Sequence, residues 1–589
     1  MDEKYNWKLT DIFKNDEEFN NSKNIIEDKL NKIEEYKGKL CDSAENLYNC
    51  YKLYEEILMI FEKVYSYGMF KYHLNMADQE GIKKFKEVES LAADLDVKTS
   101  FIVPEITYSD ENKVEEFFKE KEELSKYKRS IYEILEKKEH ILSKEEENLL
   151  ANYSEVFSGP ENIFDIMTNA EFKFGKLIDE NGKEIELTET NYTKYVKSQN
   201  RNVRKQAFNL LYKKYSEYIN TITEIYLTNV KCSSVTAKLR KYKSSLEEAV
   251  LNDDASIKVY EALMESINKN LSSNHEFIKL KKELLKEKDY HMYDLYVNPF
   301  ENNEDNITFE EAKKEVLNAL SVLGEKYTSK LQEAFDNNWI DVYEKPNKRG
   351  GAYSSGVYDV HPFVLMSFTN TKRDVSTIAH ELGHSMHSYF AEKNQNILDS
   401  NYTIMIAEVA STVNEILLSE YQIVNEKDNR KKAEIIYELL EMIRATFFRQ
   451  SMFAEFEKII HEKIENGEAL SSEDLNDIYY NLNQKYFGNN IIVDKEIQFE
   501  WARIPHFYSD FYVYKYATGI SAAIYIANKI LKHENGYLEK YIQMLSQGKA
   551  KKSIDLLKMV DVDLENVEVY DEVIKYFNEK MDILKKSYN

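Results

Sequence analysis

The chain has little of the residues that interrupt or cross-link a fold. Its 589 residues include only 6 prolines and 16 glycines, and a scarcity of helix-breaking residues favours long helices over many short strands. There are three cysteines, an odd number, and none lies in a CxxC motif: Cys41, Cys50 and Cys232. This pattern predicts no disulfide framework, and it fits a reducing cytoplasm best.

Long uncharged hydrophobic runs and a basic surface are missing as well. No apolar window approaches the ~18 uncharged residues of a membrane helix, and the first residues, "MDEKYNWKLTDIF", lack the basic start and apolar stretch of a signal peptide. The formal net charge is −25, which repels phosphate backbones. We therefore expect a cytoplasmic protein that binds neither nucleic acid nor membrane. The sequence leaves the oligomeric state undetermined.

What the sequence does contain is helical periodicity. Across residues 20–150, apolar side chains recur at spacings of three and four, which is typical of amphipathic helices. The stretch "LSKEEENLLANYSEVF" begins with Ser143 and has Glu146 three residues later, the pattern of a capping box at a helix start. A mostly α-helical fold is therefore expected.

One stretch breaks this helical pattern. The segment "EFKFGKLIDENGKEIEL" alternates apolar and polar residues on either side of Asn181-Gly182, which predicts a β-hairpin. Helical periodicity resumes near Thr193. We expect an N-terminal helical region, residues 1–195, that ends in this hairpin, and a second region, residues 196–589.

Three of the 11 histidines fall in the stretch "STIAHELGHSMHSYF", residues 376–390. His380 and His384 are four residues apart, so on a helix their imidazoles project from one face. Both can then reach a single ion at the ~2.0–2.1 Å of a zinc–nitrogen bond. A helix that merely carries two surface histidines is the alternative.

The residues around these histidines suit a hydrolytic metal site. Glu381 lies about 100° round the helix from its neighbour and can lean toward the ion without binding it, as a base acting on metal-bound water must. Gly383 costs ~1 kcal/mol in helix propensity, which indicates close packing or room for a ligand. Asp374 or Ser376 is expected to cap this helix, which should run to about Lys393.

Three carboxylates compete for the third ligand position. Glu392 is ~12 Å along the helix axis from the second histidine and cannot reach the ion. Asp399 lies in a polar loop and remains a possible third ligand. Glu408 lies within the apolar run "YTIMIAEVASTVNEILL", where a carboxylate must be paired, hydrogen-bonded or bound to metal. Glu408 is therefore favoured. Glu415, two turns later on the same face, can orient a histidine by a hydrogen bond.

His387 is not expected to be a ligand. The extended motif with a third histidine requires Gly at position 387 and His at position 390, and here these are His387 and Phe390. His387 should instead pack beside the site or support it. Two histidines, one carboxylate and an open position describe a catalytic zinc rather than a structural one.

Two other segments are candidates for the rest of the site. The loop Gly350–Gly356 and the expected strand Phe363–Phe368 precede the histidine helix and form either a groove wall or an ordinary structural loop. Farther along, "WARIPHFYSDFYVYKYATG" offers neutral donors that can stabilise an oxyanion, although any one tyrosine can equally be structural. The donors are His506, Tyr508, Tyr512, Tyr514 and Tyr516.

Taken in order, "AHELGHSMHSYF", "IAEVASTVNE" and "IPHFYSDFYVYKYATG" resemble the oligoendopeptidase F family of zinc metallopeptidases, which is related to thimet oligopeptidase. The similarity extends to "NWKLTDIF" and "RGGAYSSGVYDVHPFVLMSF" and covers nearly the whole chain. It implies a mostly helical, two-lobed, clam-like fold with a deep central channel and a small β element beside the active-site helix. It also implies one Zn²⁺ per chain, a catalytic domain at residues 196–589 and short peptides as substrates.

The resemblance also implies roles for individual residues. The family's zinc ligands fall on His380, His384 and Glu408, and its general base falls on Glu381. Its oxyanion-stabilising pair falls on His506 and Tyr514, with Tyr508 and Tyr512 as nearby candidates that could contact substrate. Its groove lining falls on Gly351, Ala352, Tyr353 and Ser354.

These observations predict a zinc endopeptidase that cuts internal bonds of short unstructured peptides by Glu381-assisted attack of zinc-bound water. One alternative is a zinc carboxypeptidase on a similar helical scaffold. It would need a cation for the terminal carboxylate, and only Arg373 and Arg503 lie near the motifs. The other alternative is a non-catalytic helical binding module in which zinc is a staple.

Overall fold

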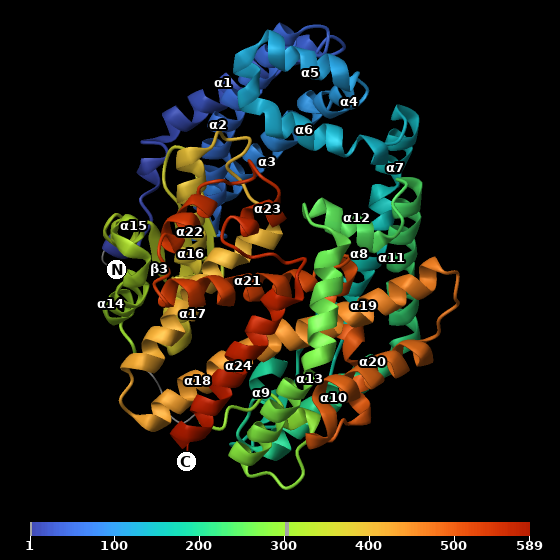
Figure 1. Ribbon diagram of the computed structural model, residues 1–589, viewed down its shortest axis with the longest axis vertical. Helices are drawn as coiled ribbons and strands as arrows, with labels where there is room; N and C mark the ends of the chain where they lie inside the picture. Colours follow the sequence, from blue (N-terminus) through green and yellow to red (C-terminus); the bar gives the residue numbers. More distant parts are fainter. Residues whose placement is uncertain (1–2, 301–305, 589) are drawn as a thin grey trace. The chain divides into compact units, whose positions relative to one another are not determined.

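The computed structural model describes residues 3–300 and 306–588 and is predominantly helical (Figure 1). The mostly α-helical class is therefore confirmed. The chain divides into two compact units, each built from three separate stretches. Unit 1 comprises residues 1–141, 304–421 and 526–562, and unit 2 comprises residues 142–303, 422–525 and 563–589. The clam-like form and the boundary between residues 195 and 196 stay predictions.

Unit 1 begins with a packed group of amphipathic helices. Helix α2 packs against α1 and α3, and its N-terminus is capped by Ser43, whose side chain accepts a hydrogen bond from the Asn46 N–H. Among the described helices, none is both long enough and apolar enough to cross a membrane. The first helices of unit 1 are α1 (Asp16–Ile33), α2 (Ala44–Leu74), α3 (Gln79–Thr99), α4 (Ile102–Thr107), α5 (Glu111–Glu120) and α6 (Lys128–Glu136).

A three-stranded sheet connects these helices to the candidate site. The strands are β3 (Ile340–Tyr343), β4 (Tyr353–Ser355) and β5 (Phe363–Phe368), in the order β3-β5-β4. The central strand β5 pairs parallel to β3 and antiparallel to β4, which confirms the strand expected there. Phe363 and Leu365 on β5 belong to the same hydrophobic core as the N-terminal helices. Trp7, which belongs to this core, binds the N-terminal segment to the sheet. Its indole N–H donates to the Trp339 and Val364 carbonyls at 3.0 and 2.9 Å.

The histidine-bearing helix is α16, Lys372–Asn394. Its cap differs from the expected one: Thr371 is the N-cap residue and Asp374 is its capping-box partner, three residues into the helix. The Asp374 carboxylate therefore accepts a hydrogen bond from the backbone N–H of Thr371 and is not itself the cap. The other helices that lie wholly or partly in unit 1 are α14 (Phe309–Ala319), α15 (Gly324–Asp336), α17 (Ile404–Asn425), the last part of α21 (Tyr514–Leu531), α22 (Tyr537–Leu545) and α23 (Ser553–Lys558).

Unit 2 contains the expected hairpin and several long helices that pack against one another. Strands β1 (Lys176–Ile178) and β2 (Glu184–Glu186) pair antiparallel, and the capping box of Ser143 and Glu146 is formed. Helix α24 packs against both α13 and α18. The helices of unit 2 are α7 (Lys144–Phe157), α8 (Gly159–Asp165), α9 (Glu189–Val196), α10 (Arg201–Glu217), α11 (Ile219–Leu239), α12 (Ser245–Asn252), α13 (Ile257–Leu285), α18 (Asn429–Ile443), α19 (Gln450–Glu465), α20 (Ser472–Phe487), α24 (Val567–Tyr588) and the first part of α21 (Tyr514–Leu531).

Candidate active site

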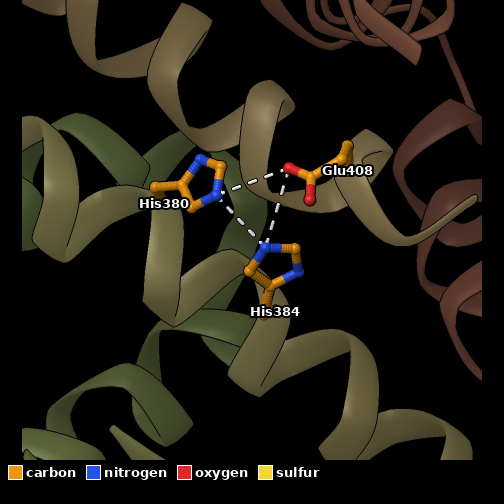
Figure 2. A group of neighbouring side chains, drawn as sticks. All are labelled: His380, His384 and Glu408. Atoms are coloured by element: carbon orange, nitrogen blue, oxygen red, sulfur yellow. Dashed lines mark hydrogen bonds and ion pairs between the residues drawn. The ribbon is translucent and has the colours of Figure 1, made fainter. Parts of the chain in front are cut away.

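Three side chains from two helices of unit 1 point at one spot. His380 and His384 come from α16 and Glu408 from α17, and Figure 2 shows both ring nitrogens and one carboxylate oxygen facing one another. The two Nε2 atoms are 3.2 Å apart. Oε2 of Glu408 is 3.4 Å from Nε2 of His380 and 3.8 Å from Nε2 of His384. The sequence-based choice of these three residues thus corresponds to three potential ligand atoms at one place.

The donor set fits a zinc ion. In a tetrahedral site with ligand bonds of 2.0–2.1 Å, ligand atoms lie about 3.3 Å apart, close to the three separations just given. Two imidazole nitrogens and one carboxylate oxygen also leave a fourth position for water or substrate. Asp399, the open alternative, lies elsewhere, because its carboxylate accepts hydrogen bonds from Ser130 and Asn396.

The close approach of α16 to α17 depends on Gly383. A Cβ atom at this position would lie 2.5 Å from Cα of Ser411 and 2.8 Å from the carbonyl oxygen of Ala410. Both contacts are with backbone, which cannot move aside as a side-chain tip can. The absent side chain lets the helix of His380 and His384 touch the helix of Glu408. This is the close packing expected from the cost of glycine in helix propensity.

Substituting Gly383 by Ala is therefore expected to force the two helices apart. Overpacking of this kind costs about 1–3 kcal/mol of unfolding free energy, and zinc affinity should fall with it because Glu408 moves away from the histidines. Chemical denaturation and zinc titration measure the two effects. Gly350→Ala is the matched control, since a Cβ there meets no atom within 4 Å. Equal stability of the two variants would contradict this account of the helix contact.

Glu415 lies behind the first histidine. Its Oε1 atom is 3.4 Å from Nδ1 of His380 and 3.5 Å from Oγ of Ser376. Burial alone would lower the pKa of His380, but the nearby carboxylates, Glu415 foremost, raise it to about 9. A carboxylate at Nδ1 fixes the ring and leaves Nε2 facing Glu408, which is how supporting groups orient metal-binding histidines.

The second histidine is held in its neutral form. Burial, and then the positive charge of His380, lower the pKa of His384 to about 4. A neutral imidazole is the form that binds a metal ion. The two histidines thus differ in environment although they share one helix face.

Glu381 is buried beside the histidines and contacts strand β4. Its carboxylate accepts a hydrogen bond from the Ser354 backbone N–H, and burial, opposed by His380, raises its pKa to about 7. Ser354 Oγ is also 2.8 Å from Ser385 Oγ on α16. Strand β4 therefore fixes the carboxylate that the sequence assigns as the base. The sequence places Ser354 in the expected groove lining but does not predict its contact with Glu381, because a backbone donor carries no residue-type signal.

His387 packs beside the site without joining it. Its ring stacks on Tyr402 with centroids 3.7 Å apart and planes 4° from parallel, and burial lowers its pKa to about 3. Among the described residues, its Nδ1 atom has no hydrogen-bond partner. This agrees with its expected role as a packed neighbour of the ligands.

The residues expected to line a substrate groove precede or begin β4. Gly351 is exposed, while Ala352 and Tyr353 are half-buried. The Tyr353 hydroxyl is 2.8 Å from Nδ1 of His73, so this side chain anchors the strand to α2. β4 pairs only with β5 within the described sheet, which leaves it an edge strand.

His506 lies in unit 2 among tyrosines, on the short 3₁₀ helix Pro505–Tyr508. Its Nε2 atom is 3.3 Å from the Tyr516 hydroxyl, and its ring centroid is 5.7 Å from that of Tyr512. Burial and the charge of Arg449 lower the pKa of His506, so the imidazole is neutral at pH 7. Tyr516, which the sequence did not single out, is the tyrosine whose hydroxyl contacts this histidine.

Tyr514 and Tyr508 have different surroundings from Tyr516. The Tyr514 side chain is fully buried, and its hydroxyl donates to Oδ2 of Asp253 at 2.9 Å. Tyr508 is buried against Phe164, with ring centroids 4.5 Å apart. Their functional roles stay predictions, and both side chains have a structural explanation.

Known proteins are similar to this chain over nearly its full length, and two family models match most of it. A model of peptidase family M3 matches residues 194–576, and a model described as oligopeptidase F matches residues 105–174. Oligopeptidase PepF of Bacillus subtilis (strain 168) is 41% identical over 580 residues, which cover 98% of this chain and 86% of that protein.

Solved structures agree with these sequence matches. A chain from Chlamydophila abortus, described as a peptidase, has a TM-score of 0.92 at 31% identity and covers 100% of this chain and 99% of its own. Oligoendopeptidase-F from Enterococcus faecium has a TM-score of 0.75 at 31% identity and covers 97% of this chain and 99% of its own.

Proposed function

This chain belongs to peptidase family M3 as a metalloendopeptidase of the oligoendopeptidase F type, and from that premise we propose that it uses zinc to cut internal bonds of short unstructured peptides. The observation that carries the proposal is the convergence of His380, His384 and Glu408, with nitrogen and oxygen atoms 3.2–3.8 Å apart. A buried carboxyl, Glu381, lies next to the two histidines on α16.

In this proposal the three converging side chains hold the ion and Glu381 moves the proton. A bound zinc ion supplies Lewis-acid chemistry: it polarises the scissile carbonyl and makes water more acidic. A carboxylate oxygen of Glu381 accepts the proton of the attacking water and returns it to the leaving amine. The hydrogen bond from the Ser354 N–H supports this assignment, because a backbone donor on β4 fixes the carboxylate beside the histidines.

His506 and Tyr516 supply the neutral donors for the developing oxyanion. A donor fixed before the reaction stabilises that charge without reorganisation. The 3.3 Å contact between Nε2 of His506 and the Tyr516 hydroxyl supports pairing these two residues. Tyr514 is the weaker candidate, since its buried hydroxyl is engaged by Asp253.

Two conservative variants separate these tyrosines. Tyr516→Phe should lower kcat about 10²–10³-fold, the usual cost of removing one oxyanion donor, with little change in KM. Tyr514→Phe should instead leave kcat near the wild-type value and lower stability by about 1–3 kcal/mol, because Asp253 loses a buried donor. Steady-state kinetics and denaturation are the measurements, and the reverse pattern would return the role to Tyr514.

The substrate is proposed to be an extended peptide segment. An edge strand such as β4 offers main-chain groups that bind peptides by strand addition, and Gly351 and Ala352 lead into it. A folded chain cannot present its backbone in this way, which restricts cleavage to short or unstructured peptides. The protein is further proposed to act in the cytoplasm, without nucleic acid or membrane.

Product mapping tests the function. The purified chain is mixed with unstructured peptides of graded length and with one folded protein, with and without a zinc chelator, and the products are identified by mass spectrometry. Internal cuts in short peptides, abolished by chelator and restored by Zn²⁺, are expected.

The alternative functions predict other products. Removal of single C-terminal residues would favour a carboxypeptidase, which requires a free cation for the terminal carboxylate. Arg503 does not offer one, because its guanidinium is bound to Glu189. Zinc binding without any cleavage would leave the non-catalytic module.

A further inference from the structure

Unit 2 contains a second cluster of possible metal ligands, made of one imidazole and two carboxylates. Glu457 and His461 lie one turn apart on α19, and Asp510 lies on the segment between the 3₁₀ helix Pro505–Tyr508 and α21. One ligand atom from each lies within 4.8 Å of the other two. Nε2 of His461 is 3.7 Å from Oδ1 of Asp510, which is too long for a hydrogen bond.

The hydrogen bonds of His461 show that Nε2, rather than Nδ1, carries the free lone pair in the neutral ring. Its Nδ1 is 2.8 Å from Oγ of Ser245, and that hydroxyl donates its only hydrogen to Oε1 of Glu465 at 2.6 Å. Ser245 must therefore accept from the Nδ1–H group, so a neutral His461 carries its bare lone pair on Nε2. That atom is buried, and no described residue hydrogen-bonds to it.

The carboxylates face this lone pair without a donor between them. Oε1 of Glu457 accepts from the Phe511 N–H at 2.7 Å, but Oε2 has no hydrogen-bond partner among the described residues, and Glu457 is 0% exposed. Asp510 is held from α11, where Ser233 donates to Oδ2 and Asn229 to Oδ1. Two buried, unpartnered acceptors, Nε2 of His461 and Oε2 of Glu457, beside a third acceptor on Asp510 cost several kcal/mol unless something positive lies between them.

We propose that Glu457, His461 and Asp510 form a second metal site, separate in sequence and in side chains from the His380 centre. One imidazole nitrogen with two carboxylate oxygens suits Zn²⁺ or a similar transition-metal ion. Ca²⁺ and Mg²⁺ prefer an all-oxygen set. Ser245 and Glu465 occupy the position of the supporting groups that fix a metal-binding histidine.

The surroundings suit a structural ion with an entry path. The Asp510 side chain is 28% exposed, so an ion can enter from that side. Phe511 adopts a φ of 51°, an unfavourable value for a bulky residue, and this conformation accompanies the hydrogen bond from its N–H to Glu457. An ion here ties α19 to the segment that runs from His506 to Tyr516.

Metal stoichiometry tests the proposal. The full-length protein is stripped with chelator, reloaded with excess Zn²⁺, desalted and analysed by elemental mass spectrometry. Two zinc ions per chain are expected for the wild type and one for His461→Gln. One is also expected for the double variant His380→Ala/His384→Ala, which keeps only the second site.

A second measurement guards against misfolding of the His461 variant. In the His380→Ala/His384→Ala background, Zn²⁺ should raise the melting temperature by several degrees. Adding Glu457→Gln should abolish both the shift and the remaining zinc. One zinc ion per chain in the wild type would overturn the proposal whatever the variants do, and would assign the cluster a shared proton. Two ions in the wild type with no loss in His461→Gln or Glu457→Gln would also overturn it.

Discussion

Glu381→Gln is expected to lower kcat about 10³–10⁴-fold, at the upper end of what general acid–base catalysis contributes. The amide keeps the size of the side chain but cannot accept the proton of the attacking water. Bound zinc should stay near the wild-type amount, because the proposed ligands are His380, His384 and Glu408. Steady-state kinetics together with elemental analysis of the same sample separates the two properties.

A matched control lies on the same helix. Glu392 is a partly buried carboxyl of α16, and burial, then the charge of Glu62, raise its pKa well above the usual value. The protonated acid is nearly isosteric with an amide, so Glu392→Gln should keep kcat within a few-fold. Full activity of Glu381→Gln would remove the base from the mechanism, and equal losses in both variants would point to a general disturbance of α16.

The second large effect is expected from Glu408→Gln, which should weaken zinc binding by more than about 100-fold. Loss of a supporting partner of a ligand typically costs 10–100-fold, and removal of an anionic ligand should cost more. A competition titration against a chelator of known affinity measures the change. Activity at limiting zinc should fall in parallel and recover in part when zinc is added in excess.

Glu415→Gln is the comparison variant for this titration. Its side chain lies 3.4 Å from Nδ1 of His380 and belongs to the same helix as Glu408, so it should cost only about 10–100-fold in affinity. If Glu408→Gln binds zinc like the wild type, the third ligand must be sought elsewhere. Asp399 would then be tested in the same way, despite its hydrogen bonds to Ser130 and Asn396.

The candidate metal centre could be predicted from the sequence because a few neighbouring residues determine each part of it. A four-residue spacing places His380 and His384 on one helix face, and a lone carboxylate in an apolar run singles out Glu408. The hairpin at Asn181-Gly182 and the capping box at Ser143 are local in the same sense. Each of these features is set by a few neighbouring residues, and the structure has the corresponding geometry in every case.

The remaining features depend on contacts or backbone forms that residue spacing does not encode. Residues 505–513 do not form an α-helix, so no α-helical periodicity indicates that Tyr516 rather than Tyr514 contacts His506. The helix cap was misplaced because Thr371 and Asp374 form a reciprocal pair in which either can look like the cap.

Contacts between distant stretches were the hardest to foresee. Glu457 and His461 show the four-residue spacing of a ligand pair, but Asp510 reaches them only in three dimensions. Unit 1, likewise, is assembled from three stretches that the sequence gives no reason to group.

The three-stretch construction of unit 1 has a consequence for the order in which the protein can fold. Helix α16 packs against α22, near the end of the chain, and Gln395 Nε2 donates to the Ser546 carbonyl at 2.9 Å. A growing chain therefore carries the helix of His380 and His384 long before it carries the residues that cover that helix. Contacts of such large sequence separation form slowly, so the packing of α16 against α22, and any activity that depends on it, should be acquired late in folding.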